Sequence, residues 1–330
     1  MIKILDCTLR DGGHVIGCHF GQHIITDIVS ALNKSHCDII ELGFLMDKPY
    51  NMDYSIFNNC KQAEEFIPNN SQCEYSLLTQ QDQYNPDLLE DCNGKIRHIR
   101  VSFHTYDKSE GFECAKKIKD KGYDLHINPI NFTGYSHDEM LEMIEKVNIL
   151  RPSTFSIVDT FGSLLLPQLN EINQLIDKHL EKDISVALHL HENLSSSFVL
   201  AQSFILDNQN KRDISVDASI DGMGKIPGNM PIELIMDFAN RYLNKSYDIS
   251  ALLDVNVKYL TKIKDDSRWG YDLPFALAAQ KNIHRSYAAY AIDHKATIPE
   301  IYSFLVSLSK DKKSVYDKNY AEIMFNKKVA

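Results

Sequence analysis

The sequence predicts an α/β fold: a parallel (β/α)8 barrel followed by a helical C-terminal extension. Three observations support this prediction. Short β-rich runs alternate with amphipathic stretches over residues 1–245, which is typical of parallel strands joined by right-handed crossovers. Polar residues gather just after the apolar runs, where the active rim of such a barrel lies. From about Ser246 onward only helical patterns continue.

An open, doubly wound sheet is the alternative, but no GxGxxG motif follows the first strand. We therefore assign residues 1–245 to a TIM-barrel catalytic domain and residues 246–330 to a helical extension. The strands are expected near Lys3–Asp6, Asp38–Leu42, Tyr75–Leu78, His98–Phe103, Asp124–Ile130, Thr154–Asp159, Ser185–His191 and Ser215–Ile220.

Apolar residues at helical spacing place helices between and after these strands. Within the barrel the clearest are Gln22–Ser35, Glu110–Lys121, His137–Leu150 and Leu166–Leu180. Another helix begins around Pro231, and its apolar face is expected to carry Ile232, Ile235, Phe238, Ala239 and Tyr242. In the extension the predicted helices are Ala251–Ile263, Phe275–Ile283, Ser286–Asp293 and Pro299–Leu308, with Trp269 packing the extension onto the barrel. The Lys/Asp-rich tail from Lys310 is expected to be partly solvated.

Composition and charge exclude several classes of protein. The formal net charge of −10 argues against nucleic acid as the main partner. No apolar run approaches the roughly 20 residues needed to span a bilayer, and no basic-apolar leader precedes the first strand. The seven cysteines form no CxxC pair, which is typical of reduced thiols. We expect a cytoplasmic protein.

Polar residues follow seven of the eight predicted strands. In chain order they are Arg10 and Asp11, Glu41, His104, Asn128 and Asn131, Asp159, His189 and His191, and Asp221. Because the C-terminal ends of parallel barrel strands form one rim, these side chains are expected to surround one site.

Two stretches within this set predict a metal site. The first predicted strand is followed by the turn RDGGH, whose glycines allow the backbone to change direction sharply. His189 and His191 are two residues apart on a strand and therefore face the same side. Two imidazoles and the carboxylate of Asp11 would make a three-ligand site for a divalent cation, with positions left for substrate. Asn229, in the glycine-rich loop DGMGKIPGN, is the candidate fourth ligand.

The motifs DCTLRDGGH, HLHEN and GMGKIPGN, in this order, resemble those of the DRE-TIM metallolyase (HMGL-like) superfamily over about residues 1–240. Within that group the chain is most similar to the 4-hydroxy-2-oxovalerate aldolases, which carry a histidine three residues after the metal aspartate, as His14 stands here. The resemblance implies a divalent-metal-dependent (class II) aldolase that cleaves or forms a 4-hydroxy-2-oxo acid through a metal-stabilised pyruvate enolate.

The residue roles follow from that chemistry. Arg10 is expected to stabilise the developing enolate oxygen, because its guanidinium is permanently charged. His14 is expected to act as the general base on the C4 hydroxyl. The resembling aldolases also use a tyrosine from the C-terminal helices, for which Tyr287 and Tyr290 are the candidates. The remaining candidates are expected to line the substrate pocket; they are Glu41, His104, Asn131, Asp159 and Thr160.

Several alternatives stay open from sequence. The expected cofactor is Mn²⁺ or Mg²⁺, with Co²⁺ as a third choice. An acyl-CoA-dependent Claisen-condensing synthase of the isopropylmalate or homocitrate synthase type is the alternative function, and a non-catalytic binding subunit is a third. The expected partners are a small 2-oxo acid and an aldehyde, without nucleic acid or membrane. The apolar C-terminal helices could form a homodimer face. The C-terminal third departs from the aldolases' communication domain, so a dehydrogenase partner stays open.

Overall fold

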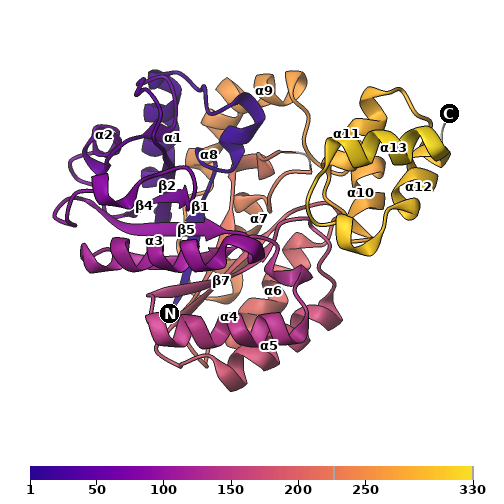
Figure 1. Ribbon diagram of the computed structural model, residues 1–330. Helices are drawn as coiled ribbons and strands as arrows, with labels where there is room; N and C mark the ends of the chain where they lie inside the picture. Colours follow the sequence, from indigo (N-terminus) through magenta and orange to yellow (C-terminus); the bar gives the residue numbers. More distant parts are fainter. Residues whose placement is uncertain (226, 329–330) are drawn as a thin grey trace.

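The computed structural model describes residues 1–225 and 227–328, and its centre is a closed parallel barrel (Figure 1). Strand β1 pairs with β9 on one side and with β2 on the other, which closes the sheet. The barrel strands are β1 (Ile2–Asp6), β2 (Ile39–Leu45), β4 (Glu74–Gln80), β5 (Ile96–Phe103), β6 (Asp124–Pro129), β7 (Thr154–Asp159), β8 (Ser185–Leu190) and β9 (Ile214–Ala218). Each predicted strand is present, and the (β/α)8 prediction is confirmed.

One short strand was not expected. Strand β3 (Ile56–Phe57) pairs with the outer end of β2, where the register of β2 against β4 shifts between Glu41 and Phe44. Gly43 makes this approach possible, because a Cβ there would lie 2.1 Å from the carbonyl oxygen of Ser55. Its φ of +150° is also a conformation that favours glycine.

Helices cover the outside of the barrel. They are α1 (Gln22–Lys34), α2 (Cys60–Glu64), α3 (Lys108–Asp120), α4 (His137–Leu150), α5 (Leu166–His179), α6 (Ser197–Asn208) and α7 (Ile232–Tyr242). Helix α4 shows how sequence sets such a boundary: the Ser136 hydroxyl accepts from the Glu139 backbone N–H, and the Glu139 carboxylate accepts from the Ser136 N–H. The four predicted barrel helices are present within two residues at each end.

Helix α7 begins directly after Pro231 and buries Ile232, Ile235, Phe238 and Ala239, as predicted. Tyr242 lies on the same face, with its ring centroid 5.3 Å from that of Phe238, as predicted. It is the last residue of the helix and is 71% exposed.

The C-terminal residues divide between two hydrophobic clusters. Side chains of α8 (Ser250–Val255), the π-helical turn Asn256–Leu260 and the segment through Trp269 pack in the barrel's own core, next to α9 (Thr261–Asp266). A second cluster is built by α10 (Leu273–Ala279), α11 (Ser286–Asp293), α12 (Ile298–Ser307) and α13 (Lys318–Lys328). We call these four helices the C-terminal lobe; Figure 1 shows the lobe beside one end of the barrel.

The segment between α9 and α10 joins the lobe to the barrel. Trp269 is buried, and its indole N–H donates to the carbonyl oxygen of Asp221 at 2.7 Å. The N–H of Gly270 donates to the carbonyl oxygen of Pro227 at 2.7 Å. Both acceptors belong to the glycine-rich loop after β9, so the packing predicted for Trp269 is confirmed.

Two compositional expectations can be compared with the structure. All seven cysteines are free. Among the helices formed by the described residues, none has the length and apolar character required to cross a bilayer.

Candidate metal centre and active site

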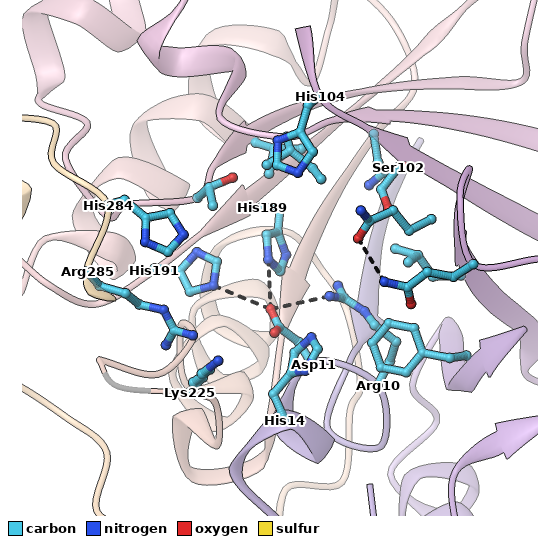
Figure 2. Close-up of a pocket in the computed structure, with 18 of the residues that line it drawn as sticks. Arg10, Asp11, His14, Ser102, His104, His189, His191, Lys225, His284 and Arg285 are labelled. Atoms are coloured by element: carbon cyan, nitrogen blue, oxygen red, sulfur yellow. Dashed lines mark hydrogen bonds and ion pairs between the residues drawn. The ribbon is translucent and has the colours of Figure 1, made fainter. Parts of the chain in front are cut away.

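Asp11, His189 and His191 meet at the C-terminal rim of the barrel (Figure 2). One oxygen of Asp11, Oδ2, lies 3.0 Å from Nε2 of His189 and 3.4 Å from Nε2 of His191. The ligand atoms of the three side chains all lie within 4.8 Å of one another. The structure therefore brings the three predicted metal ligands together.

Barrel topology explains why residues so distant in sequence meet. Strands β1 and β8 both pair with β9, so their C-terminal ends lie on one rim, a single strand apart. After β1, the carbonyl oxygen of Cys7 accepts from the N–H groups of Arg10, Asp11 and Gly12, and this tight turn directs Asp11 inward. The His189 ring and the His191 ring are 4.9 Å apart because residues i and i+2 of a strand face the same side.

The other nitrogen of each imidazole is fixed by an acceptor behind it. Nδ1 of His189 lies 3.0 Å from Oδ2 of Asp217 on β9, and Nδ1 of His191 lies 2.9 Å from the carbonyl oxygen of Asp159. Both acceptors favour a proton on Nδ1 and point Nε2 toward Asp11, where its lone pair would be available to a bound cation. An oriented pair of imidazoles beside a carboxylate is a donor set that suits a divalent cation.

Charge at this centre is also set by the surroundings. Burial alone would raise the pKa of Asp11, but Arg10 and the two histidines outweigh it and hold that pKa well below its usual range. Arg10 is buried too, yet Glu41 and Asp11 raise its pKa above the ordinary value. Asp11 is therefore an anion ready to bind a cation, and Arg10 remains charged.

Asn229, the predicted fourth ligand, lies beside His191 through an isolated antiparallel bridge. Its Nδ2 donates to the carbonyl oxygen of Met223 at 2.9 Å, while its Oδ1 is buried without a hydrogen-bond partner among the described residues. Gly228 shapes this loop, since its φ is +93° and a Cβ would lie 2.5 Å from the carbonyl oxygen of Gly222. A buried, unpaired amide oxygen is compatible with a ligand role, which stays a prediction. Ile226 of the same motif lies outside the described residues.

A layer of buried charges lies beneath the centre. The guanidinium of Arg100 on β5 pairs with Glu41 on β2 at 3.2 Å and with Asp217 on β9 through a short contact. Glu41 also accepts from Nε of Arg10 at 2.7 Å. These strands are not neighbours in the sheet, so Arg100 crosses the barrel interior. Neither Arg100 nor Asp217 was predicted from sequence; the signal was a charged residue between apolar neighbours in each strand.

The centre opens into a cavity of about 360 Å³, within the range of small-molecule sites. Arg10, His14, His104 and Thr160 all line it, as predicted. The His14 side chain is exposed at the cavity, yet the loss of solvation around its ring lowers its pKa to about 4. Burial also lowers the pKa of His104. Both imidazoles are therefore neutral near pH 7 and can accept a proton.

Three residues expected in the pocket do not line it. Glu41 lies below the cavity, bonded to Arg10 and Arg100. The Asp159 carboxylate accepts from the N–H groups of Ser163 and Leu164 and so closes the turn after β7. The N–H of Asn131 donates to Oγ1 of Thr160 at 2.7 Å. None of the three side chains is among those that line the cavity, and their expected contact with substrate stays a prediction.

The two tyrosines also lie away from the cavity. The Tyr287 ring is fully buried in the C-terminal lobe, and its hydroxyl donates to the carbonyl oxygen of Lys312 at 3.0 Å. Tyr290 stacks on His294 with ring centroids 4.1 Å apart and contacts Phe325. The structure thus does not bring either phenol to the site, because helix α11 turns this face toward the lobe's own core.

Residues just before α11 occupy the cavity wall instead. His284 and Arg285, in the loop between α10 and α11, line it together with Lys225 of the glycine-rich loop. The loop is held by the His284 ring against Phe161, with centroids 5.5 Å apart, and by the Ser163 hydroxyl, which donates to Asn282 at 3.2 Å. Lys225 belongs to the motif GMGKIPGN, whereas His284 and Arg285 lie between two predicted helices, and none of the three had an expected role.

The chain is similar to two kinds of curated enzyme. Among curated proteins, the chain is 24% identical over 265 residues to the 4-hydroxy-2-oxovalerate aldolase of Geobacillus genomosp. 3, covering 77% of this chain and 75% of that protein. It is 23% identical over 262 residues to the 2-isopropylmalate synthase of Pseudoalteromonas atlantica, covering 71% of this chain. The match spans 46% of that synthase, about half of its length.

Solved structures show the same fold. The N-terminal domain of a Bacteroides vulgatus protein provisionally described as an aldolase aligns with a TM-score of 0.75 at 23% identity, covering 88% of this chain and 97% of that one. An HMG-CoA lyase from Acenitobacter baumannii, in complex with coenzyme A and 3-methylmalate, aligns with a TM-score of 0.64 at 14% identity, covering 81% of this chain and 93% of that one.

A family model confirms the resemblance seen in the three motifs. Residues 95–258 match the model described as HMGL-like. The matched segment includes His189, His191 and the glycine-rich loop, while Asp11 lies before it. On this evidence the chain carries an HMGL-like domain.

Proposed function

We propose that this protein is a divalent-metal-dependent aldolase that cleaves or forms a 4-hydroxy-2-oxo acid. One observation carries the proposal: the ligand group Asp11, His189 and His191 faces the same cavity as Arg10 and His14. This arrangement places a cation site, a fixed positive charge and a neutral imidazole around one substrate. The aldolases among the protein's relatives support the reaction class.

The residues present fit a divalent cation, with Asp11, His189 and His191 as ligands and Asn229 as the proposed fourth. A cation bound there acts as a Lewis acid toward the oxygens of a 2-oxo acid and stabilises the charge of its enolate. Imidazole ligands favour Mn²⁺ or Co²⁺ over Mg²⁺ by affinity, whereas cellular supply favours Mg²⁺. We propose Mn²⁺ or Mg²⁺.

Arg10 is proposed to stabilise charge on the substrate. Glu41 and Asp11 hold the guanidinium in place, at 2.7 Å and 3.4 Å, so little reorganisation is needed during reaction. When the C3–C4 bond of the substrate breaks, its electron pair moves toward the ketone oxygen. A guanidinium donor already aimed at the cavity would stabilise that oxygen more strongly in the transition state than in the ground state.

His14 is proposed to move the proton. The neutral imidazole accepts the proton of the C4 hydroxyl while the C4–O bond becomes the carbonyl of the leaving aldehyde. The enolate that remains takes a proton at C3 from water, to which the His14 imidazolium returns its own proton, and becomes pyruvate. In the opposite direction the same groups would add pyruvate to an aldehyde.

An acyl-CoA-dependent condensation is the second candidate, and the 2-isopropylmalate synthases among the relatives favour it. The same cation site and Arg10 could serve either reaction. The two candidates differ in what they release: the aldolase yields pyruvate without CoA, and the synthase yields free CoA thiol from an acyl-CoA.

The assay follows from that difference. We expect the Mn²⁺-loaded full chain to release pyruvate from 4-hydroxy-2-oxo acids without CoA, measured with lactate dehydrogenase and NADH. EDTA should abolish the release and added Mn²⁺ should restore it. Thiol release from acetyl-CoA in the presence of 2-oxo acids, with no pyruvate release from any 4-hydroxy-2-oxo acid, would reject the aldolase in favour of the synthase.

Arg10→Ala is expected to lower kcat by about 10²–10³-fold, because it removes transition-state stabilisation. The fold should persist, since Glu41 keeps its pairing with Arg100. Arg10→Lys retains the charge without the planar donor geometry and should recover only part of the loss. Steady-state kinetics measure the effect, and circular dichroism confirms folding; kcat within threefold of wild type in a folded alanine variant, roughly 0.6 kcal/mol, would contradict the role.

A further inference from the structure

The cavity has a second cationic side that the proposed chemistry does not use. Lys225 reaches it from the glycine-rich loop after β9, and Arg285 reaches it from the C-terminal lobe. Figure 2 shows these two side chains on one side of Asp11 and Arg10 on the other. The cation site therefore lies between two separate positive groups.

The charged residues around the cavity favour an anion on this second side. Among the described lining residues, Arg10, Lys225 and Arg285 are cationic and Asp11 is a carboxylate. Glu41 already neutralises Arg10 from below the cavity. Asp11 acts electrostatically on both Lys225 and Arg285, but a divalent cation at the ligand group would compete for that carboxylate. A bound 2-oxo acid would bring its carboxylate to the cation and Arg10, and so leave the other side positive.

Lys225 and Arg285 are also close enough to repel each other. Burial and then Arg285 lower the pKa of Lys225 below its ordinary value. Burial lowers the pKa of Arg285 to about 10. An anion bound between these two groups would offset their repulsion.

His284 completes this side as a neutral, fixed group. Burial and then the charges of Arg285 and Lys225 lower its pKa to about 4. Its ring lies against Phe161 on one side and Tyr316 on the other, with centroids 5.5 Å and 6.2 Å apart. The loop that carries Arg285 is therefore held in place by the packing of His284.

We propose that Lys225 and Arg285 bind an anionic group, a carboxylate or a phosphate, on the aldehyde half of the substrate. This inference rests on the proposed aldolase function, because it assigns the 2-oxo acid to the cation and Arg10. It specifies the substrate class: the acceptor aldehyde is charged, and the cleaved compound is a 4-hydroxy-2-oxo acid with an anionic group beyond C4.

Binding of unreactive ligands tests the inference without requiring turnover. 2-Oxoglutarate and 2-oxopentanoate share a 2-oxo acid group and a five-carbon chain, but only the first ends in a carboxylate. In calorimetry with Mn²⁺-loaded protein we expect 2-oxoglutarate to bind about tenfold more tightly or better. For a phosphate, glycerol 3-phosphate is compared with glycerol in the presence of pyruvate. Whichever charged ligand shows the larger advantage identifies the anion.

The variants Lys225→Gln and Arg285→Gln should each reduce that advantage by about tenfold, and Arg285→Lys should retain part of it. Lys281→Gln removes an exposed charge four residues before Arg285 and should leave the advantage unchanged. Because each advantage is a ratio measured on one protein, a partly unfolded variant lowers both affinities and not their ratio.

Equal affinities within both ligand pairs for the wild-type protein, or an advantage that survives both glutamine variants, would overturn the proposal. Failure of the aldolase itself has a different signature: no 4-hydroxy-2-oxo acid, charged or neutral, would yield pyruvate, while the binding ratios would still decide the role of Lys225 and Arg285.

Discussion

His191→Ala is expected to abolish stoichiometric binding of Mn²⁺ and, with it, catalytic activity. The variant removes one of three converging ligands, and Nε2 of His191 lies 3.4 Å from the Asp11 oxygen that the ligands share. Loss of groups that merely orient a ligand already costs about 10–100-fold in metal affinity, so loss of a ligand should cost at least about 100-fold. Calorimetry with Mn²⁺ and elemental analysis of the purified protein measure the effect.

Two further variants make this experiment specific. Asp217→Asn keeps all three ligands but weakens the acceptor behind Nδ1 of His189, and should reduce affinity by an intermediate 10–100-fold. His137→Ala removes a histidine whose side chain is 71% exposed at the start of α4, and should bind Mn²⁺ like the wild type. Full Mn²⁺ occupancy in His191→Ala would show that the three side chains do not form the cation site.

The barrel could be predicted from sequence because its signals are local and repeated. A parallel strand is buried on both faces, so it appears as a short apolar run, and eight such runs alternate with helices. The tail after Lys310 carried no comparable signal. It nevertheless forms helix α13. Ala321 and Phe325, four residues apart on this helix, are buried in the hydrophobic cluster that it shares with the other helices of the C-terminal lobe. Two buried apolar residues are enough to stabilise such a helix when a packing partner exists. The sequence of the helix itself does not reveal that partner.

The ligands could be predicted for a related reason. Asp11, His189 and His191 are placed by strand ends and by the two-residue period of a strand, both of which follow from sequence and topology. No comparable rule predicts which residues of the C-terminal lobe face the site. The predicted helix Ser286–Asp293 was expected to bring a tyrosine to the site, yet the packing of α11 turns Tyr287 inward and leaves His284 and Arg285 at the cavity. Which part of a helix–loop segment faces a site depends on how the lobe packs.

The buried charges show the same limit within the barrel. Arg100 and Asp217 are 117 residues apart, and each is a charged residue among apolar neighbours in its strand. Such a residue could point to the interior or to a polar gap between helices. Only the closed barrel shows that both point inward and pair. Asp217, the partner of Arg100, is also the acceptor that orients His189, so the same carboxylate serves the fold and the proposed cation site.

Arg100→Met is therefore expected to lower the free energy of unfolding by about 3–5 kcal/mol, because it leaves buried carboxylates with an incomplete partner set. The Arg100 side chain is fully buried between Glu41 and Asp217. Glu41 would retain Arg10 and Asp217 would retain His189, which places the expected loss nearer the lower figure than for an isolated pair. Urea unfolding followed by circular dichroism measures the change.

The matched control lies on the same strand. Arg97 of β5 is 55% exposed and pairs with Asp124 at 4.0 Å, so Arg97→Met should change the free energy of unfolding by less than about 0.5 kcal/mol. If burial of unpaired charge is the cause, the triple variant Arg100→Met, Glu41→Gln and Asp217→Asn should regain part of the stability lost in Arg100→Met. A single variant as stable as Arg97→Met would show that the carboxylates do not depend on Arg100. Recovery in the triple variant without recovery of metal affinity would separate the two roles of Asp217, as a partner of Arg100 and as the acceptor that orients His189.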